Sequence, residues 1–151
     1  DPAVSAEVLA GLADVLGVDI DPQAVEGARE AVYGDVKTDG FDEVGFVTDP
    51  SKYLCPTDDG VRVADTVADR AGFRNLDITD LSAEGFDVAL CRNLLIYVDD
   101  EKKKAVVDSL TDSLETGGYL VLGKTERVPR GYADVFETVD SRLRVYRYVG
   151  E

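Results

Sequence analysis

The chain contains no histidine, tryptophan or methionine, and its 151 residues include only two cysteines. The lack of histidine excludes histidine general bases, Ser-His-Asp triads and His-rich metal sites. Cys55 and Cys91 are far apart and form no paired motif, so we expect reduced thiols with no zinc site and no disulfide. No apolar run approaches the ~18–20 residues of a membrane span, and no basic leader precedes an apolar stretch. Because Asp1 is not a methionine, we expect residues to be missing upstream.

Basic residues are scarce, because 16 Lys and Arg face 31 Asp and Glu, which gives a formal net charge of -15. This charge argues against nonspecific nucleic-acid binding, which needs cations to displace phosphate counterions. The acids are mostly aspartate and are spread over the whole chain, and lysine is scarcer than arginine. The pattern favours adaptation to high salt, with an ordinary acidic cytosolic protein as the alternative. Either way, the charge reports on solubility and not on the fold.

Apolar residues make up 44% of the chain, which is too many for a disordered acidic tail, and the length suits one domain. The spacing of apolar residues predicts a helix over 3–13 and a strand over 15–20. A second helix is predicted over 21–33, with Asp21 as its N-cap and Pro22 at its first position. The first part of the chain therefore indicates a strand, a turn and a helix.

Residues 34–60 have a different character and predict an insertion or long loop, and residues 62–69 predict a strand. The rest of the chain alternates again. The predicted elements are strands over 72–78, 86–91 and 119–123, a helix capped by Asp99 or Asp100 and ended by Gly117-Gly118, and a closing strand pair over 135–140 and 143–149. This order predicts an α/β fold with a mostly parallel sheet and a terminal antiparallel pair. Ligands bind such sheets at the carboxyl ends of the strands.

Two acids follow predicted strands at that edge. Asp19 stands where a carboxylate can accept hydrogen bonds from both ribose hydroxyls of a nucleotide cofactor, although a helix cap is an equally good interpretation. Asp77 and Ile78 suit the edge and face of an adenine ring. The segment taken alone favours a turn acid beside a core isoleucine.

The motif CRNLLIY, residues 91–97, follows a buried strand directly. Arg92 and Asn93 are therefore expected at the carboxyl edge of the sheet. Arg92 and Tyr97 are five residues apart, so one helical turn brings both near the cleft. The alternative is that Arg92 pairs with a neighbouring acid and Tyr97 lies in the core.

Four segments together resemble the chemotaxis receptor glutamate methyltransferases of the CheR type. They are GVDIDPQAVEGAREAVY, VRVADTVADRAGFRNLDI, FDVALCRNLLIYVDDEKKKAVVDSLTDSLETGGYLVLGKTE and the closing VYRY. The stretch FDVALCRNLLIYVD is the most specific of these matches. The resemblance extends from about Val15 to Tyr148, which is nearly the whole chain.

The resemblance implies a class I, Rossmann-like methyltransferase domain with the inserted subdomain at 34–70, which in some members docks a receptor tail. It implies transfer of a methyl group from S-adenosylmethionine to glutamate carboxylates on the cytoplasmic domain of chemoreceptors. The protein would be a cytoplasmic monomer that binds no nucleic acid, enters no membrane and needs no metal.

The resemblance also assigns roles to residues. Asp19 holds the ribose, and Asp77 and Ile78 contact the adenine. Arg92 and Tyr97 lie beside the methyl donor and are the expected catalytic residues. Cys91 and Asn93, from the same motif, complete the expected cofactor-binding set.

Methyl transfer to a carboxylate is chemically compatible with a chain that has no histidine. A glutamate is already ionised at neutral pH, so it needs no general base, and catalysis reduces to alignment and desolvation.

One part of the family pattern is absent, because nothing before Val4 matches its first strand, its Gly-containing acidic loop or its helical N-terminal domain. We therefore expect a partial domain whose sheet lacks its central strand. The alternative function is a non-catalytic receptor-docking or regulatory module derived from the same fold.

Overall fold

A computed structural model describes residues 14–33, 48–58 and 60–150 of the chain. It divides the chain into two compact units, Asp1–Leu76 and Asp77–Glu151, which we call unit 1 and unit 2. The predicted helix over 3–13 lies outside the described residues.

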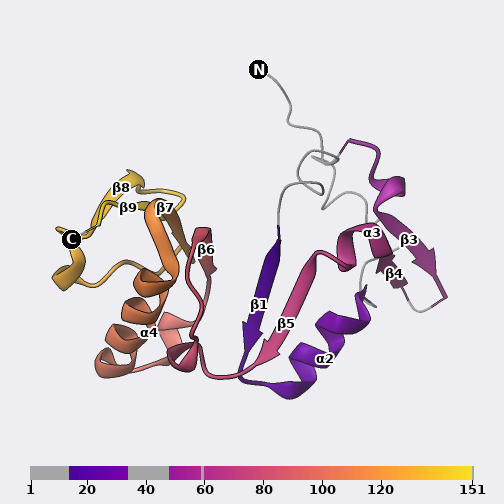
Figure 1. The fold of residues 1–151 in the computed structure, drawn as a ribbon, viewed down its shortest axis with the longest axis horizontal. Coiled ribbons are helices and arrows are strands. Elements are labelled where there is room, and N and C mark those ends of the chain that lie inside the picture. The colour runs from indigo at the N-terminus through magenta and orange to yellow at the C-terminus, as the bar shows by residue number, and fades with distance from the viewer. Residues whose placement is uncertain (1–13, 34–47, 59, 151) are drawn as a thin grey trace. The chain divides into compact units, whose positions relative to one another are not determined.

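Unit 1 is built on a parallel pair of strands, β1 (Val15–Asp19) and β5 (Ala71–Asn75). Figure 1 shows β1 as the indigo arrow and β5 as the magenta arrow, with α2 (Pro22–Glu30) beside them. As predicted, Asp21 caps α2, and its Oδ1 accepts a hydrogen bond of 2.9 Å from the Gln23 amide. The strand, turn and helix predicted from the sequence are present, but the helix predicted over 21–33 ends at Glu30, because Ala31 is left-handed and Val32–Tyr33 form a strand.

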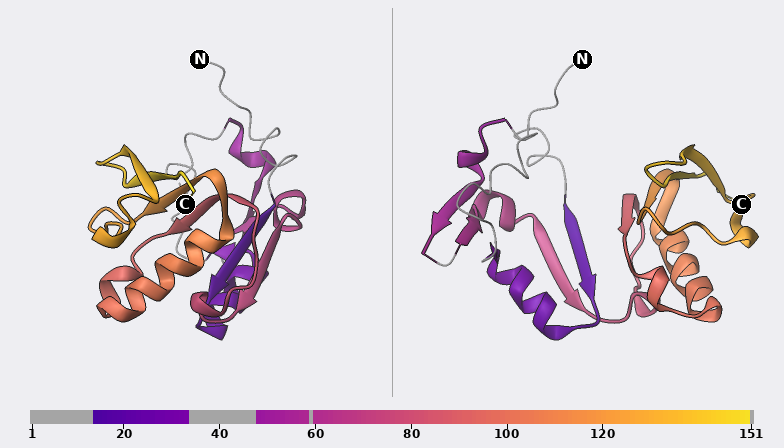
Figure 2. Two further views of the ribbon diagram at one scale, coloured as in Figure 1. Left: turned by 60° about the vertical axis from the view of Figure 1, so that its left-hand side comes forward. Right: turned by 180° about the vertical axis from the view of Figure 1, so that it is seen from behind.

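Unit 1 also contains a three-stranded antiparallel sheet in the order β2 (Val32–Tyr33), β4 (Gly60–Val63) and β3 (Leu54–Thr57). Figure 2 shows this small sheet from two further sides. A single 3₁₀ turn, Pro50–Lys52, precedes β3. The sheet falls partly within 34–70, where the sequence predicts an inserted subdomain.

The strand predicted over 62–69 is wrong beyond its start, because β4 ends at Val63 and a one-turn helix, α3 (Asp65–Ala68), follows. The Ala64 carbonyl accepts hydrogen bonds from the amides of Val67 and Ala68, which closes the turn. Asp65 in the first turn also favours a helix start through its negative charge.

The strand predicted over 72–78 likewise ends early. β5 stops at Asn75, and Asp77 caps a 3₁₀ turn, Ile78–Asp80.

Unit 2 contains a four-stranded sheet in the order β6 (Phe86–Cys91), β7 (Leu114–Leu122), β9 (Val145–Tyr148) and β8 (Phe136–Asp140). The β6–β7 pair is parallel, whereas β7–β9 and β9–β8 are antiparallel. The predicted terminal antiparallel strand pair is present as β9–β8, and parallel pairing occurs in β1–β5 of unit 1 and in β6–β7 of unit 2, which belong to separate sheets.

The long helix of unit 2 is α4 (Asp100–Ser113), which Asp99 caps by accepting a 2.9 Å hydrogen bond from the Lys102 amide. The prediction that Gly117-Gly118 ends this helix is wrong, because both glycines lie inside β7. The β6–β7 register shifts there, and a Cβ on Gly118 would come within 2.9 Å of the Glu115 carbonyl oxygen. Gly118 is needed for this close backbone approach rather than for a helix end.

The core of unit 2 contains ten buried residues from α4, the sheet and the 3₁₀ turn Leu95–Tyr97. They are Cys91, Leu95, Val106, Val107, Leu110, Leu114, Leu120, Leu122, Phe136 and Tyr146. Val88 and Leu90 alternate with the core residues of β6 and are 51% and 71% exposed. Within unit 2, the core therefore covers one face of this strand. No helix among the described residues is long and apolar enough to cross a membrane.

Candidate active site

The carboxyl edge of unit 1 presents Asp19, the last residue of β1. Its side chain is exposed, and its Oδ1 accepts a hydrogen bond of 2.8 Å from the Asp21 amide. That bond fixes the turn into α2, while the second carboxylate oxygen has no partner among the described residues. The geometry leaves one oxygen of Asp19 able to accept a hydrogen bond from a ligand hydroxyl.

Asn75 ties the two strand ends of this edge together, and the sequence gives no local signal for that role. Its Nδ2 donates to the carbonyl oxygens of Asp19 and Ile20, at 3.0 and 2.9 Å. An asparagine directly after a strand is an ordinary turn residue by pattern. Its role follows from the parallel register, which places Asp19 opposite Asn75.

Asp77 has a set of partners within unit 2. Its Oδ1 accepts bonds from the amide and hydroxyl of Thr79, at 3.0 and 2.8 Å, and its Oδ2 accepts a 2.6 Å bond from the Lys102 ammonium. The hydrogen bond from Lys102, followed by those from Thr79, lowers the pKa of Asp77 to about 2. Both oxygens are therefore engaged, and a ligand amine must share or replace one of these bonds.

Ile78 is partly buried against the core of unit 2. Its carbonyl oxygen accepts a 2.6 Å hydrogen bond from the Ser109 hydroxyl of α4. The residue is thus anchored to the helix, and part of its side chain remains for contact with a ligand.

Cys91 ends β6 and is only 7% exposed. Burial, followed by the nearby charge of Glu126, raises the pKa of its thiol to about 11. The thiol is therefore neutral and packs in the core, so a cofactor contact at this residue would use its main chain.

Arg92 and Tyr97 lie on the loop after β6, and both side chains are exposed, Tyr97 to 80%. Among the described residues, Arg92 forms no ion pair with an acid, and Tyr97 does not lie in the core. Neither side chain has a hydrogen bond or ion pair within the described residues. Leu95, between them, is 3% exposed and anchors the 3₁₀ turn Leu95–Tyr97 in the core.

The conformation of this loop is held by Glu126, a residue that the sequence reasoning missed. The Glu126 carboxylate is 3% exposed and accepts three main-chain hydrogen bonds of 2.7 Å, from the amides of Asn93, Leu95 and Gly123. A buried carboxylate that satisfies three amides makes charge-assisted hydrogen bonds in a low dielectric. Glu126 therefore ties the loop after β6 to the loop after β7.

The packing around Glu126 explains two unusual backbone positions. Asn93 has a φ of 60°, a left-handed conformation that asparagine tolerates better than most residues. A Cβ on Gly123 would lie 2.5 Å from Glu126 Oε2 and 2.7 Å from Asn93 Oδ1. Gly123 is thus required because the two loops approach so closely.

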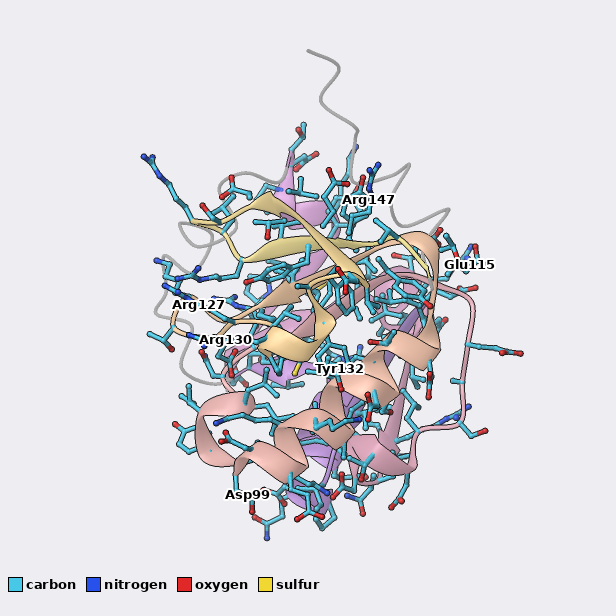
Figure 3. The ribbon with its side chains drawn as sticks, turned by 90° about the vertical axis from the view of Figure 1, so that its left-hand side faces the viewer. Asp99, Glu115, Arg127, Arg130, Tyr132 and Arg147 are labelled. Atoms are coloured by element: carbon cyan, nitrogen blue, oxygen red, sulfur yellow. The ribbon has the colours of Figure 1, made fainter. Side chains whose placement is uncertain are left out.

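The carboxyl edge of unit 2 therefore combines a fixed loop with an unpartnered guanidinium and an exposed phenol. The cation suits a carboxylate, and the phenol can orient a reacting group. Figure 3 labels Asp99 at the start of α4 and Arg127 on the loop after β7. No cluster of potential metal ligands occurs among the residues that the structure describes.

The chain matches the family model described as "CheR methyltransferase, SAM binding domain" over residues 4–145. A Vibrio parahaemolyticus protein named chemotaxis protein methyltransferase is 39% identical over 84 residues, which cover 54% of this chain and 30% of that protein. A Listeria innocua protein of the same name is 29% identical over 116 residues, or 76% of this chain and 43% of that protein. The chain thus spans less than half the length of these curated relatives.

Among solved structures, the chain is similar to the N-methyltransferase NodS of Bradyrhizobium japonicum. The TM-score is 0.48 with 13% sequence identity, and the match covers 98% of this chain and 83% of that one.

Proposed function

The chain belongs to the CheR methyltransferase family, and from this premise we propose that it methylates glutamate side chains of chemotaxis receptors. Its α/β fold is that of the class I methyltransferases, and the matched family model is the SAM-binding domain, so its cofactor is S-adenosylmethionine. The acceptor would be a glutamate carboxylate on the cytoplasmic domain of a receptor, and the product a glutamyl methyl ester.

Methyl transfer to a carboxylate requires no proton transfer by the protein. A glutamate is ionised well below neutral pH and carries its own nucleophilic oxygen. The cofactor supplies a methyl group already activated by a positive sulfur. The residues of the chain then have to align the carboxylate and exclude water, which is consistent with a chain that has no histidine.

The observation that carries the proposal is the fixed loop after β6, which exposes Arg92 and Tyr97 without partners. The Arg92 guanidinium would hold a carboxylate, of the acceptor or of the cofactor, through paired N–H donors. The Tyr97 hydroxyl would orient a reacting group. Glu126 keeps the backbone of this loop in place and is a positioning residue.

The remaining predicted residues would bind the cofactor. Asp19 would accept a hydrogen bond from the ribose through its unpartnered oxygen. Asp77 would contact the adenine amine only by sharing an oxygen with Lys102 or Thr79, while Ile78 offers apolar contact. Cys91 and Asn93 would contribute through the backbone, because Cys91 is buried.

The test is methylation of a purified chemoreceptor signalling domain with methyl-labelled S-adenosylmethionine. We expect alkali to release the label as methanol, because esters hydrolyse in base whereas N-methyl groups do not. Arg92→Ala and Tyr97→Phe should each lower kcat/KM at least tenfold. Arg74→Ala is the matched control, because Arg74 is also exposed and unpaired but lies in unit 1.

The proposal is wrong if the label is alkali-stable or if both variants methylate as the wild type does. Calorimetry with S-adenosylhomocysteine, on this chain and on an N-terminally extended one, separates the alternative. An enzyme binds this product in at least one form. Binding by neither form favours a non-catalytic docking module.

A further inference from the structure

The cations of this acidic chain divide into two groups. Eight Lys and Arg side chains form ion pairs with nearby acids: Arg29, Lys52, Arg62, Arg70, Lys102, Lys103, Lys104 and Arg147. The other described cations have no carboxylate partner in the described part of the chain. They are Arg74 in unit 1 and a group in unit 2 that we call the edge cations: Arg92, Lys124, Arg127, Arg130, Arg142 and Arg144.

The topology brings the edge cations to one edge of the unit 2 sheet. Arg92 follows β6 and Lys124 follows β7, two parallel strands whose ends pair at Cys91 and Leu122. The turn between the antiparallel strands β8 and β9 reaches the same edge, because the Arg144 Nε donates a 3.0 Å hydrogen bond to the Lys124 carbonyl oxygen. The edge cations near residues 92, 124 and 144 are thus neighbours.

Arg127 and Arg130 extend this group along the loop after β7. In Figure 3 the two side chains project from the same side of unit 2, on the side away from Glu115. Both are exposed, and Arg127 directly follows Glu126, whose carboxylate bonds to the loop of Arg92.

Three acids near this edge accept hydrogen bonds from the backbone. Glu126 is buried and accepts three amide hydrogen bonds. Asp140 Oδ1 accepts from the amides of Arg142 and Leu143, at 2.7 and 2.9 Å. Asp99 caps α4. In a chain with 31 acids, the cations of this edge therefore keep their charge for an external partner.

We propose that the edge cations dock an acidic protein segment, the stretch that carries the methyl-accepting glutamate. The proposal rests on the proposed function, because it assigns the acceptor's approach to the edge where Arg92 and Tyr97 lie. Arginine guanidinium groups bind carboxylates through two parallel hydrogen bonds, and five of the six edge cations are arginines. A segment with several carboxylates would be held by Arg127, Arg130 and Arg142 while one glutamate reaches Arg92.

The overall charge selects protein carboxylates over nucleic acid as the partner. A nucleic acid is a long polyanion that would extend beyond the edge cations. It would then be repelled by the rest of the protein, because the chain has a net charge of -15. A short acidic segment meets only the local cations. Such contacts also persist in salt, because bidentate pairs act at about 3 Å, within the ~3 Å screening length of 1 M salt.

The first experiment measures binding of a dye-labelled helical peptide that contains several glutamates, by fluorescence anisotropy. A peptide with glutamine at each glutamate is the matched probe. We expect the wild-type chain to bind the glutamate peptide at least about tenfold more tightly than the glutamine peptide. The double variant Arg127→Glu/Arg142→Glu should lose this preference, whereas Arg127→Lys/Arg142→Lys should keep most of it.

The matched control for total charge is the Arg74→Glu variant, which places the same kind of reversal outside the edge. All these positions are exposed, so circular dichroism should be unchanged. The proposal is overturned if Arg74→Glu weakens peptide binding as much per charge as the edge variant. It is also overturned if both peptides bind alike or if a DNA oligonucleotide binds more tightly than the glutamate peptide.

The second experiment separates docking from chemistry. In the receptor methylation assay, Arg127→Glu/Arg142→Glu should raise KM for the receptor about tenfold and leave kcat and S-adenosylhomocysteine affinity unchanged. If neither the wild type nor the variant methylates the receptor while the wild type still binds the glutamate peptide, the proposed function is contradicted and the docking proposal is not. An unchanged receptor KM would contradict the docking proposal alone.

Discussion

Units 1 and 2 have nearly equal length but differ in how they are stabilised. Unit 2 buries ten apolar residues in one cluster, whereas the described residues of unit 1 bury only Val25 and Ala31. In unit 1, Val63, Val67 and Phe73 line an open hollow of about 340 Å³ instead of packing into a core. The comparison indicates that unit 2 has the packed core needed to hold a loop in one conformation.

The polar contacts follow the same division. In unit 1 the predicted ribose-binding residue is held by exposed hydrogen bonds, such as those from Asn75 to the carbonyl oxygens of Asp19 and Ile20. In unit 2 the loop with Arg92 is held by the buried carboxylate of Glu126. Exposed hydrogen bonds compete with water and contribute less than buried ones. We therefore expect the carboxyl edge of unit 2 to be more rigid than the carboxyl edge of unit 1.

The largest effect should come from the centre of the unit 2 core. Leu120 is 0% exposed, so Leu120→Ala should lower the free energy of unfolding by about 3 kcal/mol, the usual cost of a cavity at a buried leucine. Urea unfolding followed by circular dichroism measures this. Leu143→Ala, at a leucine that is 63% exposed, is the control and should change little. Equal effects from the two would mean that Leu120 does not lie in a packed core.

The next effect tests the buried carboxylate. Glu126→Gln keeps the size but leaves one acceptor oxygen for three amides, so we expect a loss of about 2 kcal/mol in the free energy of unfolding. Amide hydrogen exchange at Asn93, Leu95 and Gly123 should accelerate. The control Glu137→Gln removes an exposed ion pair with Arg147 and should cost at most about 0.5 kcal/mol. Unchanged exchange at the three amides would contradict the assigned role of Glu126.

A matched pair of substitutions compares the two units directly. Val107→Ala in unit 2 should cost about 2 kcal/mol, and Val25→Ala in unit 1 about 1 kcal/mol, because fewer buried neighbours surround Val25. Hydrogen exchange within each unit reports the two changes separately. If Val25→Ala proves the more costly, unit 1 has the tighter core and the comparison is reversed.

The smallest effect concerns pH. The folded pKa of Asp77 is about 2, below its ordinary value of 3.8, chiefly because Lys102 donates to it. Asp77 therefore stabilises the fold fully above pH 4, and this stabilisation is lost as the pH falls through about 2. Because the side chain is partly exposed, we expect about 1 kcal/mol, measured as the difference in stability between wild type and Asp77→Asn. Lys102→Gln should raise the Asp77 pKa, and an unchanged NMR titration would contradict this.

The elements that the sequence predicts correctly have local signals. Asp21 and Pro22 begin α2, and the continuous apolar run over 86–91 predicts the strand β6, although Val88 and Leu90 of this strand are exposed. The one-turn helix α3 escapes prediction because its alternating residues also fit a strand. Gly117 and Gly118 resemble a helix end, but their role depends on the neighbouring strand.

The candidate site divides in the same way. Asp19, Arg92 and Tyr97 are predicted from their positions at or after strands. The structure places Asp19 at the end of β1, Arg92 directly after β6 and Tyr97 in the 3₁₀ turn that follows, and all three are exposed. The Lys102 partner of Asp77 and the Asn93 and Leu95 partners of Glu126 are 25 to 33 positions away in the chain. No local pattern encodes such contacts, because they arise only when the loops and α4 pack against each other.

The two thiols differ in solvent access, so their rates of reaction with a thiol reagent report on the opening of unit 2. Cys55 is exposed in β3 and will react at once with a thiol reagent, which counts the protein present. The Cys91 thiol, with a pKa of about 11 and almost no access to solvent, reacts only after unit 2 opens. The delay between the reaction of the first and the second equivalent of reagent therefore measures how long the core of unit 2 stays closed.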